Sequence, residues 1–299
     1  MIAIDLGSNS CRFLHFDCKS GKKLGEFEAL VKSADGLHVS GKISIKAQER
    51  VIKAIQDAKK HLDFTNQEIL AYTTEAMRQA SNSTEVLKEI ERQTKVKFEI
   101  IDAKREAIYT LDAVRYRLKA MNKEIKSLIL IDIGGGSTEL TFLYGEEIFS
   151  KSFKIGIVTV AQQCQTLQEV KSHLKVLFKE VEQYVEAIYK EYQKPQLFVA
   201  TAGTPTTISA YLLGMNYKTY NSDKINGYTL TCKGIQRALS ELMDMSEMKR
   251  AEYVGVGRES LIGSGIVIVQ SFYKLLGFSS AVVVDDGLRE GIALSYCKS

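Results

Sequence analysis

Two short stretches decide the fold that this sequence predicts: Ile-Asp-Leu-Gly-Ser-Asn-Ser at 4–10 and Ile-Asp-Ile-Gly-Gly-Gly-Ser at 131–137. Their starting points lie 127 residues apart (131 − 4 = 127). Each begins as an apolar strand, passes through an Asp-x-Gly turn of small residues and enters a second strand-like run, so both predict a β-hairpin. Because the Asp falls in the same register twice, the repeat indicates two related domains rather than a solenoid.

Outside the repeat, the chain alternates short strands with longer helices, which is typical of an α/β protein. Runs rich in β-branched or aromatic residues predict strands at 2–5, 13–17, 68–73, 96–101, 128–133, 139–143, 197–201 and 281–284. Helical periodicity predicts helices at 45–62, 83–93, 105–119, 167–190, 235–243, 260–276 and 288–297.

Length and composition exclude several classes of protein. A chain of 299 residues favours two domains, and 45% hydrophobic with 25% charged residues is ordinary globular composition. No apolar run approaches the roughly 18 residues of a membrane span, and the N-terminus has no basic segment of a signal peptide. The net charge of +4 is too small to predict DNA binding. We therefore expect neither a nucleic acid nor a membrane as partner.

The cysteines point to a reducing compartment. Five are scattered along the chain, and none forms a Cys-x-x-Cys pair. This pattern disfavours a disulfide framework or a zinc cluster, so we expect a cytoplasmic protein.

The two hairpin turns are candidate phosphate-binding loops. Glycine allows close backbone approach, so that successive N–H groups can converge on an anion, and the serine, threonine and asparagine side chains add donors. The loop residues are Gly7, Ser8, Asn9 and Ser10 in the first copy and Gly134, Gly135, Gly136, Ser137 and Thr138 in the second.

Carboxylates beside these turns form a candidate metal site. Asp5 and Asp132 stand at the strand ends, where a carboxylate could hold Mg²⁺ or another divalent cation next to bound phosphate. Glu139, on the return strand, could complete the site, although a solvated strand glutamate is the other interpretation.

Two further segments have the pattern of a strand, a small-residue turn and a helix start, which makes an anion site at the helix N-terminus. They are 200–207 (Ala-Thr-Ala-Gly-Thr-Pro-Thr-Thr) and 285–291 (Asp-Asp-Gly-Leu-Arg-Glu-Gly). An ordinary capped turn is an equal alternative for the first. Arg289 in the second is either a phosphate ligand or a partner of neighbouring acids.

Six motifs together resemble the exopolyphosphatase/guanosine pentaphosphate phosphohydrolase family, which belongs to the superfamily of actin, sugar kinases and heat-shock chaperones. The motifs stand in the family's order and span nearly the whole chain. They are IDLGSNSCRFL (4–14), YTTEAMRQASN (72–82), REA (105–107), IDIGGGSTEL (131–140), ATAGTPTT (200–207) and DDGLREGIAL (285–294).

This resemblance implies an α/β fold of two actin-like (ribonuclease H-like) domains with an interdomain active-site cleft. We place the domains at 1–124 and 125–299, and leave open whether the last helix crosses back onto the first domain. The chain resembles the short, two-domain form of the family.

The resemblance also assigns residue roles. Both glycine loops match phosphate-binding loops, and Arg78 matches an arginine that lines the substrate cleft. Glu106 matches the proposed catalytic base, while Asp132 and Glu139 match metal-associated acids. The sequence departs from the family's Ser-Gly-Glu-Glu-Glu-Ala motif, because Lys104 and Arg105 replace the two acids before Glu106. This change alters the electrostatics around the base.

We therefore predict an exopolyphosphatase that hydrolyses the terminal phosphoanhydride bond of linear polyphosphate by metal-assisted attack of water, releasing orthophosphate. Removal of the 5′ γ-phosphate of guanosine pentaphosphate is the first alternative. An ATP-dependent phosphotransferase or chaperone-like ATPase, and a non-catalytic polyphosphate or alarmone sensor, are the others. Whether the protein forms a homodimer is left open.

Overall fold

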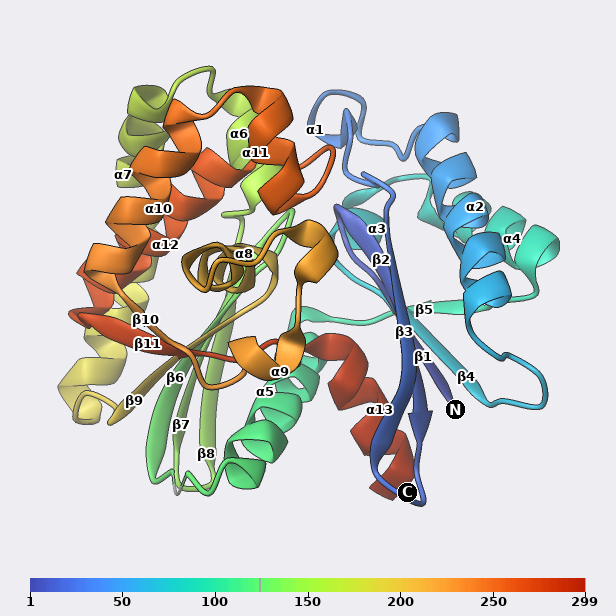
Figure 1. Ribbon diagram of the computed structural model, residues 1–299, viewed down its shortest axis with the longest axis horizontal. Coiled ribbons are helices and arrows are strands. Elements are labelled where there is room, and N and C mark those ends of the chain that lie inside the picture. The colour runs from blue at the N-terminus through green and yellow to red at the C-terminus, as the bar shows by residue number, and fades with distance from the viewer. Residues whose placement is uncertain (124, 299) are drawn as a thin grey trace. The chain divides into compact units, whose positions relative to one another are not determined.

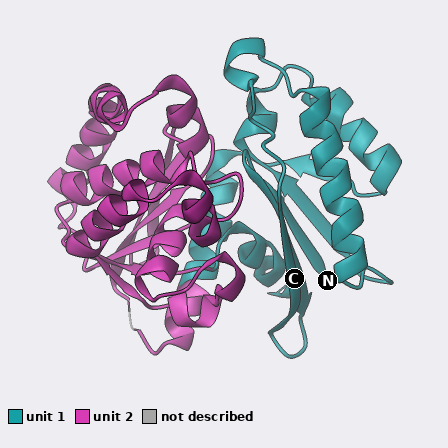
Figure 2. Ribbon diagram, turned by 45° about the horizontal axis from the view of Figure 1, so that its top comes forward, with its two compact units in different colours: residues 1–114, 286–299 teal, residues 115–285 magenta. Residues whose placement is uncertain are grey.

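The computed structural model describes residues 1–123 and 125–298 (Figure 1). The chain divides into two compact units, Met1–Val114 with Asp286–Ser299, and Arg115–Asp285 (Figure 2). The domain boundary that the sequence predicts falls at Glu124, which lies outside the described residues. None of the helices in the described ranges has the length and apolar run that a membrane crossing requires.

The first unit contains a sheet with the strand order β3-β2-β1-β4-β5. β1, β2 and β3 form an antiparallel meander, whereas β1, β4 and β5 run parallel, so that their carboxyl ends share one edge. Ligands usually bind at such an edge in α/β proteins. The elements are β1 (Ile2–Leu6), β2 (Ser10–Asp17), β3 (Lys22–Leu30), α1 (Leu37–Ser40), α2 (Ile45–His61), β4 (Ile69–Thr73), α3 (Glu75–Gln79), α4 (Ser83–Thr94), β5 (Phe98–Ile100), α5 (Ala103–Ala120, at whose Val114 the unit ends) and α13 (Leu288–Lys298).

The second unit contains a sheet with the order β10-β11-β9-β6-β7-β8, in which β6, β9 and β11 run parallel. Its strands are β6 (Ser127–Ile133), β7 (Thr138–Tyr144), β8 (Glu147–Phe153), β9 (Leu197–Thr201), β10 (Thr229–Thr231) and β11 (Ser280–Val283). Its helices are α6 (Ile157–Gln163), α7 (Leu167–Glu191), α8 (Gly203–Leu212), α9 (Ser222–Ile225), α10 (Cys232–Asp244), α11 (Glu247–Val254) and α12 (Ile262–Leu276), with a 3₁₀ turn at Tyr217–Thr219.

The two sheets repeat one plan. β3-β2-β1-β4-β5 in the first unit corresponds to β8-β7-β6-β9-β11 in the second, with the same parallel and antiparallel pairings. The hairpins predicted from the repeated Asp-x-Gly motif are β1–β2 and β6–β7. The predicted α/β class with two related halves is therefore confirmed.

The sequence missed the third strand of each meander. β3 and β8 lie at sheet edges and contain several polar or charged residues, so they lack the apolar runs by which the other strands are recognised. The seven predicted helices correspond to α2, α4, α5, α7, α10, α12 and α13. Most helices that were not predicted are short. A helix of one or two turns shows little periodicity, so its sequence gives no clear helical signal.

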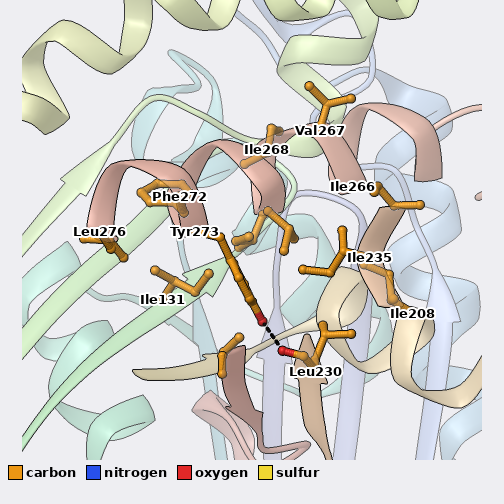
Figure 3. Packing of buried hydrophobic residues seen from close by; sticks show 14 of the residues in the cluster. Ile131, Ile208, Leu230, Ile235, Ile266, Val267, Ile268, Phe272, Tyr273 and Leu276 are labelled. Carbon is orange, nitrogen blue, oxygen red and sulfur yellow. Dashed lines mark hydrogen bonds between the residues drawn. The ribbon is translucent and has the colours of Figure 1, made fainter. Parts of the chain in front are cut away.

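A hydrophobic core supports the sheet of the second unit (Figure 3). Tyr273 of α12 is fully buried, and its hydroxyl donates a hydrogen bond to the carbonyl oxygen of Leu230 at 3.1 Å. Its ring meets Phe198 of β9 edge-on, with 4.9 Å between the centroids. Burial raises the pKa of Tyr273, so the hydroxyl stays protonated and can donate. This packing fixes β9, whose carboxyl end carries one of the candidate loops.

The C-terminal helix α13 packs against β1 and β2 of the first unit, and charges at its start hold it. Lys23 Nζ lies 2.9 Å from Asp286 Oδ1 and 3.0 Å from Glu290 Oε1. Arg289 pairs with Glu290 at 2.8 Å and with Glu26 at 2.7 Å. Burial opposes ionisation of Glu290, but Arg289 and Lys23 outweigh it and lower its pKa. Of the two interpretations of Arg289, pairing with acids is the one observed.

A disulfide joins Cys18, in the turn between β2 and β3, to Cys297 in α13, with 5.1 Å between the Cα atoms. The sequence disfavoured a disulfide framework and gave no sign of this single pair, because the two partners lie 279 residues apart and only the fold brings them together. Disulfides persist mainly in oxidising compartments. The cysteines therefore no longer support the prediction of a reducing compartment.

Candidate functional site

The first glycine loop joins β1 to β2 and turns its carbonyl oxygens away from any ligand. Gly7 N–H donates to Ser10 O at 3.0 Å, which closes the turn. The carbonyl oxygens of Gly7, Ser8 and Asn9 accept hydrogen bonds from the segment 31–34 at 2.6–3.0 Å. In the described part of the chain, the N–H groups of Ser8 and Asn9 donate no hydrogen bond, and the buried Asn9 Oδ1 has no partner. The two N–H groups are therefore available to an anion, whereas Oδ1 can only accept a hydrogen bond.

The second loop, between β6 and β7, is built in the same way. Gly134 N–H donates to Ser137 O at 2.9 Å. The carbonyl oxygens of Gly134 and Gly135 accept N–H groups of residues 157–159, at the start of α6, at 2.9–3.3 Å. Across residues 1–123 and 125–298, the N–H groups of Gly135 and Gly136 have no acceptor. Free N–H groups with occupied carbonyls make an anion-binding concavity.

Gly156, just before α6, packs against the second loop, and the sequence did not predict this contact. A Cβ atom there would stand 2.2 Å from Gly135 O and 2.4 Å from the Gly136 carbonyl carbon. Only glycine lets α6 approach the loop this closely. An isolated glycine after a strand gives no sign of such a distant partner, so this role could be found only in the structure.

Two carboxylates face each other beside the second loop. Asp132 and Glu139 are directly opposite in the β6–β7 register, so their side chains lie on one face of the sheet. Glu139 is 3% exposed, and its Oε1 accepts hydrogen bonds from Ser137 Oγ at 2.8 Å and Ser152 Oγ at 2.7 Å. Like charges directly opposite destabilise a strand pair. A bound cation would relieve that repulsion.

This donor set fits Mg²⁺. Magnesium in phosphoryl-transfer sites is usually held by one or two carboxylates, with water and phosphate oxygens completing the octahedron. The described residues contain no group of three or more histidine, cysteine, aspartate or glutamate side chains placed to hold a metal. Asp132 and Glu139, which lie opposite each other beside the second loop, are the carboxylates that would hold the ion. Asp5 fits less well, because the residue opposite it in the β1–β2 register is a cation, Arg12, whose Nε lies 3.6 Å from Glu28 Oε1.

Arg78 and Glu106 meet at the edge of the first unit's sheet. Arg78 lies at the end of α3 and Glu106 in the first turn of α5. Arg78 Nη1 is 2.9 Å from Glu106 Oε2 and donates to Ile101 O at 2.7 Å, while Glu75 Oε2 lies 3.0 Å from the guanidinium. Burial opposes the charge of Arg78, but Glu106 and Glu75 overcome this and raise its pKa. The guanidinium therefore stays charged and fixes both carboxylates.

Arg105, which departs from the family motif, is turned to other partners. It forms an ion pair with Glu99 of β5 and donates to the hydroxyls of Tyr72 at 2.9 Å and Tyr109 at 3.2 Å. Its guanidinium lies over the Tyr72 ring, 4.7 Å from the centroid. This contact is a cation–π interaction. Its charge is thus compensated by Glu99 and the tyrosines, and Glu106 is left to pair with Arg78.

The third candidate loop lies at the same sheet edge as Asp132. Thr201 ends β9 opposite Asp132 in parallel register, and Ala202 leads into α8, which starts at Gly203. Ala202 has φ 72° and ψ −176°, a region that is nearly restricted to glycine. Such strain is typical of functional segments, and nothing in the sequence Ala-Thr-Ala-Gly predicts it.

Each unit therefore gathers part of the predicted site at one sheet edge. In the first unit this edge carries Asp5, the loop 7–10 and the Arg78–Glu106 pair. In the second unit it carries Asp132, Glu139, the loop 134–138 and the start of α8.

Comparison with known proteins gives a consistent result. The profile of the Ppx/GppA phosphatase family matches residues 20–299. Exopolyphosphatase 2 of Mycobacterium tuberculosis is 26% identical over 98% of this chain and 97% of its own length. A bifunctional 3-dehydroquinate synthase/phosphatase of Fusobacterium nucleatum is 24% identical over 98% of this chain. The chain spans 46% of the length of that relative.

Solved structures share the fold. The Ppx/GppA family member of Aquifex aeolicus superposes with a TM-score of 0.75 at 27% identity, over 99% of this chain and 96% of that chain. An exopolyphosphatase of Cytophaga hutchinsonii superposes with a TM-score of 0.83 at 20% identity, over 99% of this chain and 97% of that chain.

Proposed function

Since the chain belongs to the Ppx/GppA phosphatase family, we propose that it is an exopolyphosphatase, which removes terminal orthophosphate from linear polyphosphate. The observation that carries this proposal is the pair of equivalent loops, each with free backbone N–H groups and occupied carbonyl oxygens. Such loops suit a ligand with a repeating row of phosphates. The names of the mycobacterial relatives support the same substrate.

Residues of the chain bind and orient the substrate in this proposal. The N–H groups of Ser8, Asn9, Gly135 and Gly136 donate to phosphate oxygens. These dipoles are fixed before the substrate arrives, so they stabilise charge on the transferred phosphoryl group without reorganising. Mg²⁺ held by Asp132 and Glu139 would neutralise charge on the phosphate oxygens. That both loops act on one polyphosphate chain stays a prediction.

Glu106 is the general base of the proposed reaction. Its carboxylate accepts a proton from the attacking water as the water oxygen bonds to the terminal phosphorus. The bridging P–O bond breaks, the shortened polyphosphate is the leaving group, and the terminal group is released as orthophosphate. Arg78 keeps Glu106 in place through the 2.9 Å contact and can turn toward phosphate when substrate arrives. Glu75 contacts the same guanidinium, so it still holds Arg78 while Glu106 takes the proton from water.

The test compares two carboxylates that contact the same arginine. Glu106→Gln should lower kcat by about 10²–10⁴-fold, because the base is lost while the side chain keeps its shape. Glu75→Gln removes the other partner of Arg78 and should cost about tenfold or less. Polyphosphate binding by the inactive variant would show that its fold is intact.

The substrate is decided in the same assay. Polyphosphate of defined length and guanosine pentaphosphate are offered side by side with Mg²⁺, and released orthophosphate and remaining chain lengths are measured. Release of orthophosphate from polyphosphate, with the chain shortened by one phosphate at a time, supports the proposal. Release only from guanosine pentaphosphate, or binding of polyphosphate without release, would replace it by the corresponding alternative. Glu106→Gln with normal turnover would remove Glu106 from the mechanism.

A further inference from the structure

A groove of the second unit lies between α7 and α12, which pack side by side (Figure 1). Its volume is about 700 Å³, and its lining includes Lys274 of α12 and four charged side chains of α7: Lys171, Lys175, Glu182 and Glu186. All four are exposed. No ion pair or hydrogen bond involves any of them within residues 1–123 and 125–298. The groove is therefore bordered by charges that the chain itself leaves uncompensated.

The order of these charges is symmetric. Along α7 the four residues are separated by 4, 7 and 4 positions, so the spacing is the same in both directions. At 3.6 residues per turn these positions fall in one narrow stripe. The first half of the stripe is positive and the second half negative. An antiparallel copy of the helix would thus place Lys171 opposite Glu186 and Lys175 opposite Glu182, twice.

The isolated helix is electrostatically unfavourable in this stripe. Lys171 and Lys175 are like charges at i and i+4, and so are Glu182 and Glu186. Like-charge pairs at this spacing destabilise a helix by about 0.2–0.5 kcal/mol each. An antiparallel copy would set an opposite charge against each of the four side chains and would so offset both repulsions. Neither an anionic nor a cationic small molecule would do so, because each would meet its own sign at one end.

We infer that the α7–α12 groove is a self-complementary interface, which binds the same groove of a second copy of this chain around a two-fold axis near Phe178 and Lys179. A two-fold interface places the same patch on both partners, as this stripe requires. The apolar floor contributes little area, since Leu174 and Phe178 are only 2% and 6% exposed. The dimer is therefore weak and depends on salt. This inference does not rest on the proposed function.

Charge exchange tests the interface. The all-acidic variant carries Lys171→Glu and Lys175→Glu, and the all-basic variant carries Glu182→Lys and Glu186→Lys. Sedimentation velocity at several concentrations in 50 mM and 500 mM salt measures association. We expect the wild-type chain to dimerise with a dissociation constant of about 1–100 μM at the lower salt, and each variant alone to bind itself at least tenfold more weakly.

The decisive step is the mixture of the two variants. All four cross-pairs then combine opposite charges, so an equimolar mixture should form a heterodimer at least as tight as the wild-type dimer. The variant with all four substitutions restores the pattern in reverse and should dimerise by itself. Circular dichroism and phosphate release check that every variant folds, because none of the four residues belongs to the proposed catalytic machinery.

Three results would overturn the inference. A wild-type chain that stays monomeric at 100 μM in low salt has no such interface. Variants that self-associate as tightly as the wild type would place the dimer on another surface. A mixture with no more association than its separate components would show that the charges do not pair across the axis.

Discussion

The two glycine hairpins have the same backbone and opposite electrostatics. In each, the first glycine N–H bonds to the carbonyl oxygen three residues later, at 3.0 Å for Gly7 and 2.9 Å for Gly134. In the first hairpin Asp5 faces Arg12 across the strands, whereas in the second Asp132 faces Glu139. One backbone plan thus sets an acid opposite a base in the first unit and two carboxylates opposite each other in the second.

The difference teaches that the repeat fixes geometry and that single side chains fix chemistry. Both turns present N–H groups and so both can bind an anion. Only the second keeps two carboxylates side by side, which is unfavourable in an empty protein and favourable with a cation. A division of roles follows, in which the first hairpin binds phosphate and the second binds phosphate with metal.

The largest effect expected from this comparison is that of Glu139→Gln. The amide keeps the hydrogen bonds from Ser137 and Ser152 but removes one of the two charges that attract Mg²⁺. We expect kcat to fall by about 10²-fold or more, since stabilisation of the phosphoryl oxygens is lost. Kinetics over a range of Mg²⁺ concentrations measure both kcat and the half-saturating concentration, which should rise at least tenfold.

Arg12→Gln is the matched control in the first hairpin. It should leave the half-saturating Mg²⁺ concentration unchanged, because the cation is assigned to the other hairpin. Melting curves give a second readout, as Mg²⁺ should raise the Tm of the wild-type protein and of this control, but not of Glu139→Gln. Equal responses in all three proteins would break the proposed division of roles.

The turn that follows each hairpin's second strand provides the next contrast. Cys18 in the β2–β3 turn is bound to Cys297, whereas the β7–β8 turn has Gly145, the residue 127 positions later, in its place. A disulfide that closes a long loop stabilises by about 2–5 kcal/mol. Cys297→Ser should therefore lower the Tm clearly, by destabilising the unit that contains α13.

Thermal unfolding with and without a reducing agent measures this effect. The reducing agent should lower the Tm of the wild-type protein to that of Cys297→Ser and should leave the variant unchanged. Cys232→Ser, which removes an exposed free thiol of the second unit, serves as control and should respond to reduction like the wild type. A wild-type Tm that reduction does not change would contradict a disulfide with this role.

The close contact of Gly156 with the second loop predicts a loss of stability of intermediate size. Gly156→Ala would place a methyl group 2.2 Å from Gly135 O, so the loop 134–138 or the start of α6 must move, at a cost of about 1–3 kcal/mol. Gly7→Ala in the first loop meets only Ser10 O at 3.6 Å and should cost less than 1 kcal/mol. Denaturant unfolding compares the two variants. Equal losses would show that the loops are equally tolerant.

The sequence predicted the repeated plan because it rests on local patterns, whereas the roles of Arg78 and Glu106 came from the resemblance to the family and stay predictions. The strand, turn and strand of 131–143 carry their own signals, and so do the longer helices. Relations between distant segments left no such signal: the closeness of Gly156 to Gly135, the pairing of Cys18 with Cys297, and the Arg105–Glu99 pair. Each depends on where packing brings two segments, and a single sequence does not encode that in any short pattern.

The smallest expected effect concerns the residue after the parallel strand that neighbours each hairpin. Ala202 follows β9 with φ 72°, whereas Thr74 follows β4 with φ −125°. Glycine relieves the strain at the first position and only adds chain entropy at the second. Ala202→Gly should therefore stabilise by up to about 1 kcal/mol, and Thr74→Gly should destabilise by a similar amount, in denaturant unfolding. If Ala202→Gly gains stability but loses turnover, the strained backbone at Ala202 positions the N-terminus of α8 for catalysis. If both variants lose stability equally, the left-handed conformation of Ala202 carries no strain, and the two units are more alike at this edge than their backbones indicate.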